Sequence, residues 1–393
     1  MEHSCVQLND LPDEVLLIIF KKLNNVKVLY SLMGINKRLD KILHDSIFTT
    51  NLTLLKYLSY DSIYSLSNSM LDRYCMEILP KINNKIKCLD LESSSMEHIL
   101  LSANYPNLFG LGIYNIEKET TLRLFTVIPL LHRMSNLEQL NLYFNCSRKK
   151  TFVDGNDLKT NILNRLPQLK SFEFNIRSSI DSINQIDLPT NEYIQHTFRE
   201  FKHKKIISYV DYFQDSNSGE CYVCSYPFTM TCYERITNNF SGELFKSVSE
   251  VSLFDESSFE HEFFLQIAQS FPFMRKLTVI NMKPQNDKQC RKLKNNNNNN
   301  LLVIEYSHLT YLNLDQAHDD YVEQFLLDTK MSLPINVELH TMYKSLKTVT
   351  HNFKRNATQI NCSKVNYICT DRISRFPKHM KDYFHRVYMT RFS

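Results

Sequence analysis

One apolar pattern recurs along this chain of 393 residues and limits the folds that it can adopt. Each copy has the form L-x-x-L-x-L, with other apolar residues allowed in place of leucine, and the residue between the last two apolar positions is polar or glycine in every copy. Such alternation is typical of a short strand with one buried face. The first apolar positions of the copies are Ile86, Leu108, Leu137, Leu169, Val248, Met274 and Leu309. The sequence therefore predicts a repeated series of half-buried strands.

Most intervals between the copies are long enough for one strand and one helix. Apolar residues at helical spacing occur in residues 120–134, 156–166, 259–271 and 319–329. The layout resembles a leucine-rich-repeat solenoid of the strand-plus-helix type in degenerate form, because the asparagine that often follows the strand in that family is absent. A further degenerate unit is predicted at 333–343, where Asn336 and Thr341 occupy positions that should be apolar.

Two irregularities interrupt the repeats. The interval from Leu169 to Val248 is much longer than the others and contains strand-like stretches at 205–213 and 221–228. These stretches indicate either an inserted hairpin or repeats that have lost the pattern. The run of asparagines at 295–300 is predicted to form a loop.

The first fifty residues predict three short helices. Residues 8–23 carry Pro12 near the first turn, acidic residues directly after it and lysines in the last turn, which mark both ends of a helix. Two more helical segments follow at 26–33 and 36–48, separated by Gly34. Three small helices cannot bury this much apolar surface alone, so either a partner or the rest of the chain must cover it.

Residues 8–48 resemble the F-box, a three-helix module that docks onto the Skp-type adaptor of cullin ubiquitin ligases. The resemblance rests on Leu11-Pro12, Glu14, Val15, Leu16, Ile19, Phe20, Leu23, Val28, Leu29, Ile35, Lys37, Arg38 and Leu39. Leu39 replaces the aromatic residue often found in the third helix, and the chain contains no Trp. The resemblance implies an adaptor contact made by Leu11, Pro12, Glu14, Val15, Leu16, Ile19, Phe20, Leu23, Leu29 and Ile35. The open alternative is an ordinary helical cap on the domain that follows.

The predicted fold is therefore an α/β repeat with an N-terminal three-helix module. We expect an F-box at 1–50, a helical linker at 51–80 and a leucine-rich-repeat-like solenoid at 81–370, with an irregular insertion near 177–245. A basic segment at 371–393 with six Lys or Arg residues ends the chain.

The two resemblances together imply a substrate-recognition subunit of an SCF-type ubiquitin ligase. Its partners would be a Skp-type adaptor, through it a cullin, and an unknown target protein. The strand positions that face away from the core would contact the target, and these are Asp90, Gly112, Asn141, Tyr143, Glu173, Thr278 and Asn313. Two alternatives stay open: a repeat scaffold without a ligase role, and a nucleic-acid binder that uses residues 371–393.

Composition and motifs exclude several classes of function. The chain has 46 Lys and Arg against 42 Asp and Glu, so its net charge gives no indication of a polyanionic partner. The six glycines form no GxGxxG, GxxxxGK[ST] or GxSxG motif, so we expect no cofactor and no catalysis. Ten irregularly spaced cysteines suit a reducing compartment, and no signal or membrane span is predicted, which indicates a cytoplasmic or nuclear protein.

The best candidate for a metal site is the pair Cys221 and Cys224. In a strand, however, residues three apart point to opposite faces, so we interpret both as buried structural cysteines. His261-Glu262 begins a metalloprotease-like helix, but Leu265 stands where the second histidine is needed. No metal is expected.

Overall fold

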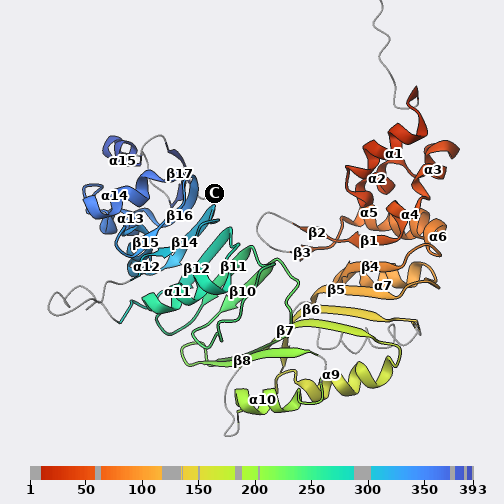
Figure 1. Ribbon diagram of the computed structural model, residues 1–393, viewed down its shortest axis with the longest axis horizontal. Coiled ribbons are helices and arrows are strands. Elements are labelled where there is room, and N and C mark those ends of the chain that lie inside the picture. Colours follow the sequence, from red (N-terminus) through yellow and green to blue (C-terminus); the bar gives the residue numbers. More distant parts are fainter. Residues whose placement is uncertain are drawn as a thin grey trace, which may run out of the picture. The chain divides into compact units, whose positions relative to one another are not determined.

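The chain forms a mixed α/β structure with two seven-stranded sheets, in which most strands run parallel (Figure 1). The computed structural model describes residues 10–57, 63–116, 134, 136–148, 151–181, 188–201, 204–286, 302–371, 377–384 and 387–391. Two compact units are present. The first contains Met1–Val210 and Ser218–Tyr226, and the second contains Asp211–Asn217 and Pro227–Ser393.

The first unit begins with four short helices: α1 (Asp13–Lys21), α2 (Asn25–Leu32), α3 (Lys37–Leu43) and α4 (Ser46–Thr49). Asparagine side chains cap two of them: Asn24 accepts a hydrogen bond from the backbone N–H of Lys27, and Asn36 accepts one from that of Leu39. Gly34, with φ of +88°, makes the turn between α2 and α3. The first two predicted helices are confirmed, and the third, predicted over 36–48, is divided into α3 and α4.

Five parallel strands form most of the first sheet: β1 (Asn51–Leu54), β4 (Cys88–Glu92), β5 (Gly110–Ile116), β6 (Gln139–Arg148) and β7 (Ser171–Asp181). β9 (Ser218–Tyr226) pairs antiparallel with β7, and β8 (Lys205–Phe213) is next to β9 at the edge. The chain turns directly from β8 into β9. Of the two interpretations of the long interval, an inserted hairpin is therefore the one that the structure shows.

The segment at 51–80, which we expected to be helical, starts instead with strand β1. Leu52 and Leu54 alternate with polar residues and are buried, which is the pattern of a half-buried strand. β2 (Lys56–Tyr57) and β3 (Ile63–Tyr64) form a small antiparallel pair. Helical structure begins only at Asn68, with α5 (Asn68–Arg73), a π-helical turn (Tyr74–Ile78) and α6 (Leu79–Ile82).

The second unit contains a parallel sheet of seven strands. In spatial order these are β10 (Cys232–Ile236), β11 (Glu250–Phe254), β12 (Lys276–Asn281), β14 (Tyr311–Ala317), β16 (Val337–His340), β17 (Val365–Thr370) and β18 (Tyr388–Arg391). β13 (Ile304–Glu305) and β15 (Met331–Ser332) form a separate short pair. The helices of this unit are α11 (His261–Ser270), α12 (Asp319–Leu326), α13 (Tyr343–Val349), α14 (Asn356–Ser363) and α15 (Lys378–Tyr383).

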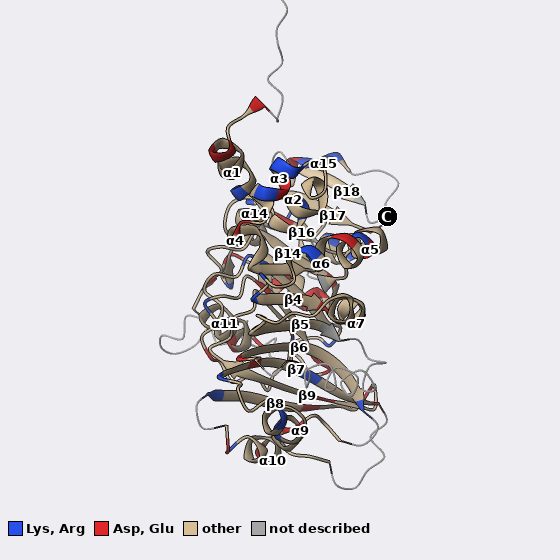
Figure 2. Cartoon of the chain, turned by 90° about the vertical axis from the view of Figure 1, so that its right-hand side faces the viewer, with Lys and Arg blue, Asp and Glu red and all other residues tan. Residues whose placement is uncertain are grey.

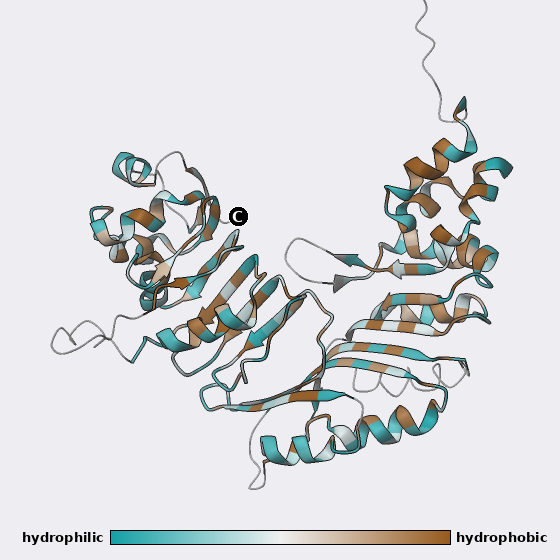
Figure 3. Ribbon diagram, viewed as in Figure 1, coloured by the Kyte–Doolittle hydropathy of each residue, from teal (hydrophilic) through white to brown (hydrophobic). Residues whose placement is uncertain are grey.

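All seven copies of the apolar pattern are strands, and in each strand the last two apolar residues of the pattern are buried. The banding along the strands in Figure 3 shows this alternation. The degenerate unit at 333–343 also contains a strand, β16. Of the four predicted helices between copies, α11 and α12 are confirmed, and residues 156–166 form α9 (Gly155–Asn161) and a short 3₁₀ helix (Leu163–Arg165).

Two predicted segments lie largely or wholly outside the described residues, namely the helix at 120–134 and the asparagine loop at 295–300. Within the described ranges, no helix combines the length and the apolar character needed to cross a membrane. Two further helices of the first unit are α7 (Ser93–Ser102), which follows β4, and α10 (Asn191–Thr197), which follows β7.

Candidate binding surfaces

The N-terminal helices expose an unusual amount of apolar surface. Val15, Ile18, Ile19 and Leu23 have exposed fractions of 38%, 60%, 38% and 55%. Val15, Ile18 and Ile19 lie on one side of α1 at the helical spacing of 100° per residue, and the half-buried Leu11 and the exposed Leu23 flank the two ends of the helix. We call these five residues the α1 stripe. Large apolar patches on an isolated chain mark surfaces that another molecule covers.

Three residues expected at the adaptor contact lie instead inside the unit. Leu16, Phe20 and Leu29 have exposed fractions of 0%, 2% and 0%. They occupy the side of α1 and α2 that packs into the helical core, so they hold the module together. Pro12, Glu14 and Ile35 are exposed. Ile18 was not among the predicted contact residues, although it is two residues from both Leu16 and Phe20, which puts it on the opposite side of a helix and could have identified it.

Polar contacts fix the orientation of these helices within the first unit. The Arg38 Nε atom of α3 lies 2.6 Å from the Asp13 Oδ1 atom of α1, and Figure 2 shows the acidic start of α1 and the basic residues of α3. The buried Tyr74 hydroxyl donates to the Val26 carbonyl at 2.6 Å, and the Arg73 guanidinium donates to the Met33 carbonyl at 2.9 Å. α2 is therefore held by the helical segment that precedes β4.

The predicted target-facing residues of the first unit lie in one row across its sheet. The register pairs Asp90 of β4 with Gly112 of β5, Gly112 with Asn141 of β6, and Asn141 with Glu173 of β7. Tyr143 lies two residues further along β6, and its ring centroid is 6.5 Å from that of Tyr114. The residues predicted to face a target are therefore adjacent across the sheet. That a target binds to this row stays a prediction.

Asp90 is the most unusual residue in this row. Its side chain and that of Tyr114 occupy the space that a Cβ atom at Gly112 would fill. Burial raises the pKa of Asp90, and a hydrogen bond from Thr53 Oγ1 to Asp90 Oδ2 at 3.1 Å acts in the opposite direction. Glu173, by contrast, forms an ion pair with Lys204 at 3.2 Å.

The second unit carries a corresponding row. Ser252 pairs with Thr278, Thr278 with Asn313, and Asn313 with His340. The His340 Nε2 atom lies 2.7 Å from Glu338 Oε1, and its ring centroid is 4.7 Å from that of Tyr311. This face therefore combines hydroxyl, amide and aromatic groups.

Asp315 lies within β14, and Asp371, whose charge acts on it, directly follows β17. Burial, and secondarily the negative charge of Asp371, raise the pKa of Asp315 to about 7. Asp371 Oδ1 accepts hydrogen bonds from the Tyr343 N–H and the Thr370 hydroxyl. The Asp315 Oδ1 atom is buried and accepts no hydrogen bond from the described residues.

The candidate metal ligands do not form a site. Cys221 and Cys224 are both fully buried, and the described part of the chain holds no group of three or more His, Cys, Asp or Glu side chains arranged for a metal ion. His261 contacts the Leu302 carbonyl through Nε2 and the Gln324 side chain through Nδ1, each at 3.0 Å. Its environment is that of a structural histidine.

The C-terminal segment packs onto the second unit. Met380 and Phe384 are fully buried, and β18 pairs in parallel with β17. Three of its six basic residues, Arg372, Arg375 and Arg386, lie outside the described residues. The chain matches no protein-family model and no curated protein.

Proposed function

We propose that this chain is the target-recognition subunit of an SCF-type cullin ubiquitin ligase. In this proposal the α1 stripe docks onto a Skp-type adaptor, and the polar rows on the sheets hold a target protein. The observation that carries the proposal is the exposed apolar stripe on a short N-terminal helix, at the positions where residues 8–48 resemble the F-box.

Covering these apolar side chains with a partner would lower the free energy, because it removes them from water. Fully burying a Val, Leu or Ile side chain contributes roughly 1.5–3 kcal/mol. Val15, Ile18, Ile19 and Leu23 are about half exposed in the chain alone, so covering each would contribute about 1 kcal/mol. Together the four contribute about 4 kcal/mol, which alone corresponds to a dissociation constant of about 1 mM, so Leu11 and polar contacts with the adaptor would supply the rest.

The proposed contribution of the chain to the reaction is proximity. Holding a target next to a ubiquitin-charged enzyme turns a bimolecular encounter into an intramolecular one, which raises the effective concentration of the target lysine. No catalytic group of this chain is needed for that role.

The test is co-purification with a Skp-type adaptor after the double substitution Ile18→Ser and Ile19→Ser. Removing about 2 kcal/mol of apolar contact should weaken adaptor binding at least tenfold. Met76→Ser is the matched control, because Met76 is an apolar residue of the same unit that is 77% exposed and lies outside the α1 stripe. That variant should retain the adaptor.

Leu16→Ala is unsuitable as a binding test, because truncation of a fully buried leucine costs about 2–5 kcal/mol of folding free energy. Undiminished adaptor capture by the Ile18 and Ile19 double variant, with thermal unfolding unchanged, would refute the α1 stripe as the docking site. Failure of the unsubstituted chain to capture the adaptor would refute the ligase role and favour a helical cap or scaffold instead.

A further inference from the structure

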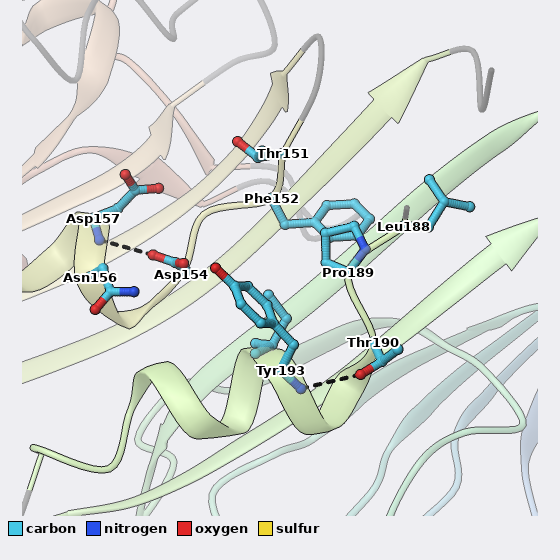
Figure 4. A pocket seen from close by; sticks show the side chains of 10 residues that line it. Thr151, Phe152, Asp154, Asn156, Asp157, Leu188, Pro189, Thr190 and Tyr193 are labelled. Atoms are coloured by element: carbon cyan, nitrogen blue, oxygen red, sulfur yellow. Dashed lines mark hydrogen bonds between the residues drawn. The ribbon is translucent and has the colours of Figure 1, made fainter. Parts of the chain in front are cut away.

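A pocket of about 510 Å³ opens in the first unit, where the chain leaves β6 for α9 and β7 for α10 (Figure 4). Its volume is within the usual range of small-ligand sites. The lining residues are Thr151, Phe152, Asp154, Asn156, Asp157, Leu188, Pro189, Thr190, Tyr193 and Ile194. None of them belongs to the strand rows or the α1 stripe.

One side of the pocket is apolar. Phe152 and Ile194 are buried, with exposed fractions of 2% and 1%, and Leu188 and Pro189 continue this surface. The Tyr193 ring is 54% exposed, and Figure 4 shows it between the apolar residues and the acidic side of the pocket. An aliphatic chain that enters here therefore meets aromatic rings as well as aliphatic carbon.

The other side carries negative charge. The Asp157 carboxylate is balanced by Arg148, whose Nη1 atom lies 2.6 Å from Asp157 Oδ2. Asp154 uses Oδ1 to cap α9, accepting a hydrogen bond from the Asp157 N–H at 2.9 Å. Among the described residues no basic side chain pairs with Asp154, and no Lys or Arg lines the pocket. The lining thus holds one unbalanced carboxylate.

We propose that this pocket binds the side chain of a lysine or arginine presented by a polypeptide. The cation would pair with Asp154, with Asn156 and the Tyr193 hydroxyl as further polar partners. The methylene stem would pack on Phe152 and Pro189, and aromatic rings near the cation add a favourable electrostatic contact. Two carboxylates in the lining disfavour an anionic ligand.

This inference rests on the proposed function only for the source of the side chain, which would be the target protein. Binding of a basic residue needs no adaptor. The pocket can therefore be tested on the whole chain alone, and its result is independent of adaptor capture.

The experiment is a saturation-transfer NMR titration of the full chain at low ionic strength with the peptide acetyl-Gly-Gly-Lys-Gly-Gly-amide. Peptides with norleucine or glutamate in place of lysine test the charge, and spermidine tests a free organic cation. We expect the lysine peptide to bind at least fivefold more tightly than the norleucine peptide, and the glutamate peptide to bind more weakly still. A preference for spermidine over the lysine peptide would overturn the polypeptide source.

Asp154→Asn is the decisive variant, because Asn caps a helix as well as Asp does and leaves α9 intact. It should weaken lysine-peptide binding about fivefold, the equivalent of about 1 kcal/mol for one charge pair. Glu192→Gln is the matched control, because it removes a carboxylate from α10 that does not line the pocket. Equal binding by Asp154→Asn and the unsubstituted chain, or an equal loss in Glu192→Gln, would overturn the proposal.

Discussion

At the residue scale, Asp315 makes the stability of the second unit depend on pH. Its pKa is raised from the ordinary 3.8 to about 7 by burial and by the nearby Asp371 carboxylate. The folded chain therefore binds this proton more tightly than the unfolded chain does. Since stability falls with pH wherever the native state holds more protons, the contribution of Asp315 is complete below about pH 4 and is lost as pH rises to about 7.

We predict that Asp315→Asn raises the melting temperature at pH 8 and leaves it unchanged or lower at pH 5. The amide keeps the shape of the protonated acid but never becomes charged. Differential scanning calorimetry across this pH range measures the effect. Asp72→Asn, an exposed aspartate of the first unit, is the control and should shift the melting temperature equally at both pH values. The same equal shift in Asp315→Asn would contradict the assignment.

The burial of residues on α1 could not be predicted from the sequence, in contrast to the burial of residues on the strands. The alternation of polar and apolar residues in the strands correctly separates buried from exposed positions, because a sheet has only two faces. On α1 every residue from Val15 to Phe20 is apolar. The sequence there cannot tell Leu16, which is buried, from Ile19, which is exposed, because that choice depends on how α2 and α3 pack against α1.

At the element scale, irregularities in β10 and β17 explain why the apolar pattern does not occur in these strands. β10 has a register shift between Tyr233 and Ile236, and Arg235 within it has a φ of +49°. β17 is joined to β16 with a shift after Val337. A bulge inserts one residue and breaks the period of two, so these strands cannot be found by strict alternation.

One buried asparagine stabilises the turn next to β12. Asn281 at the end of β12 is 2% exposed, and its side-chain amide donates to the Ser257 carbonyl at 2.7 Å. Its Oδ1 accepts from the Lys283 N–H at 2.9 Å. The Asn281 side chain thus satisfies a backbone carbonyl of the turn that follows the neighbouring strand β11.

The contact between α9 and α10 depends on a glycine. The Gly155 N–H donates to Thr197 Oγ1 at 2.8 Å, and a Cβ atom at Gly155 would overlap the Thr197 carbonyl. Since this obstacle is backbone, it cannot move aside without shifting α10. We predict that Gly155→Ala lowers the free energy of unfolding by about 1–3 kcal/mol, measured by urea denaturation.

Asn156→Ala is the neighbouring control. Asn156 is exposed, and alanine has the higher helix propensity, so that variant should change stability by less than about 0.5 kcal/mol. Hydrogen exchange should place the loss in Gly155→Ala at α9 and α10. An equally mild effect of both substitutions would show that the two helices have room to separate.

At the scale of the whole molecule, the longest interval between copies of the apolar pattern coincides with the division of the chain. The copies that start at Leu169 and Val248 belong to different units, and the boundaries of the units fall between them. The sequence revealed the irregularity but predicted a single repeat domain across it. The reason is that the pattern describes each strand locally and carries no information on which strands share a sheet.

Each unit has its own sheet and its own buried leucines, so we predict that the units lose structure separately. Leu89 of β4 and Leu277 of β12 are fully buried at equivalent places in the two sheets. Replacing either with alanine should cost about 2–5 kcal/mol in the unit that contains it. Hydrogen exchange with peptide-level resolution should then show reduced protection of β4 to β7 in Leu89→Ala, and of β11 to β17 in Leu277→Ala. Loss of protection in both sheets from either single substitution would mean that the chain unfolds as one cooperative body, because local openings are confined to the cooperative unit that contains them.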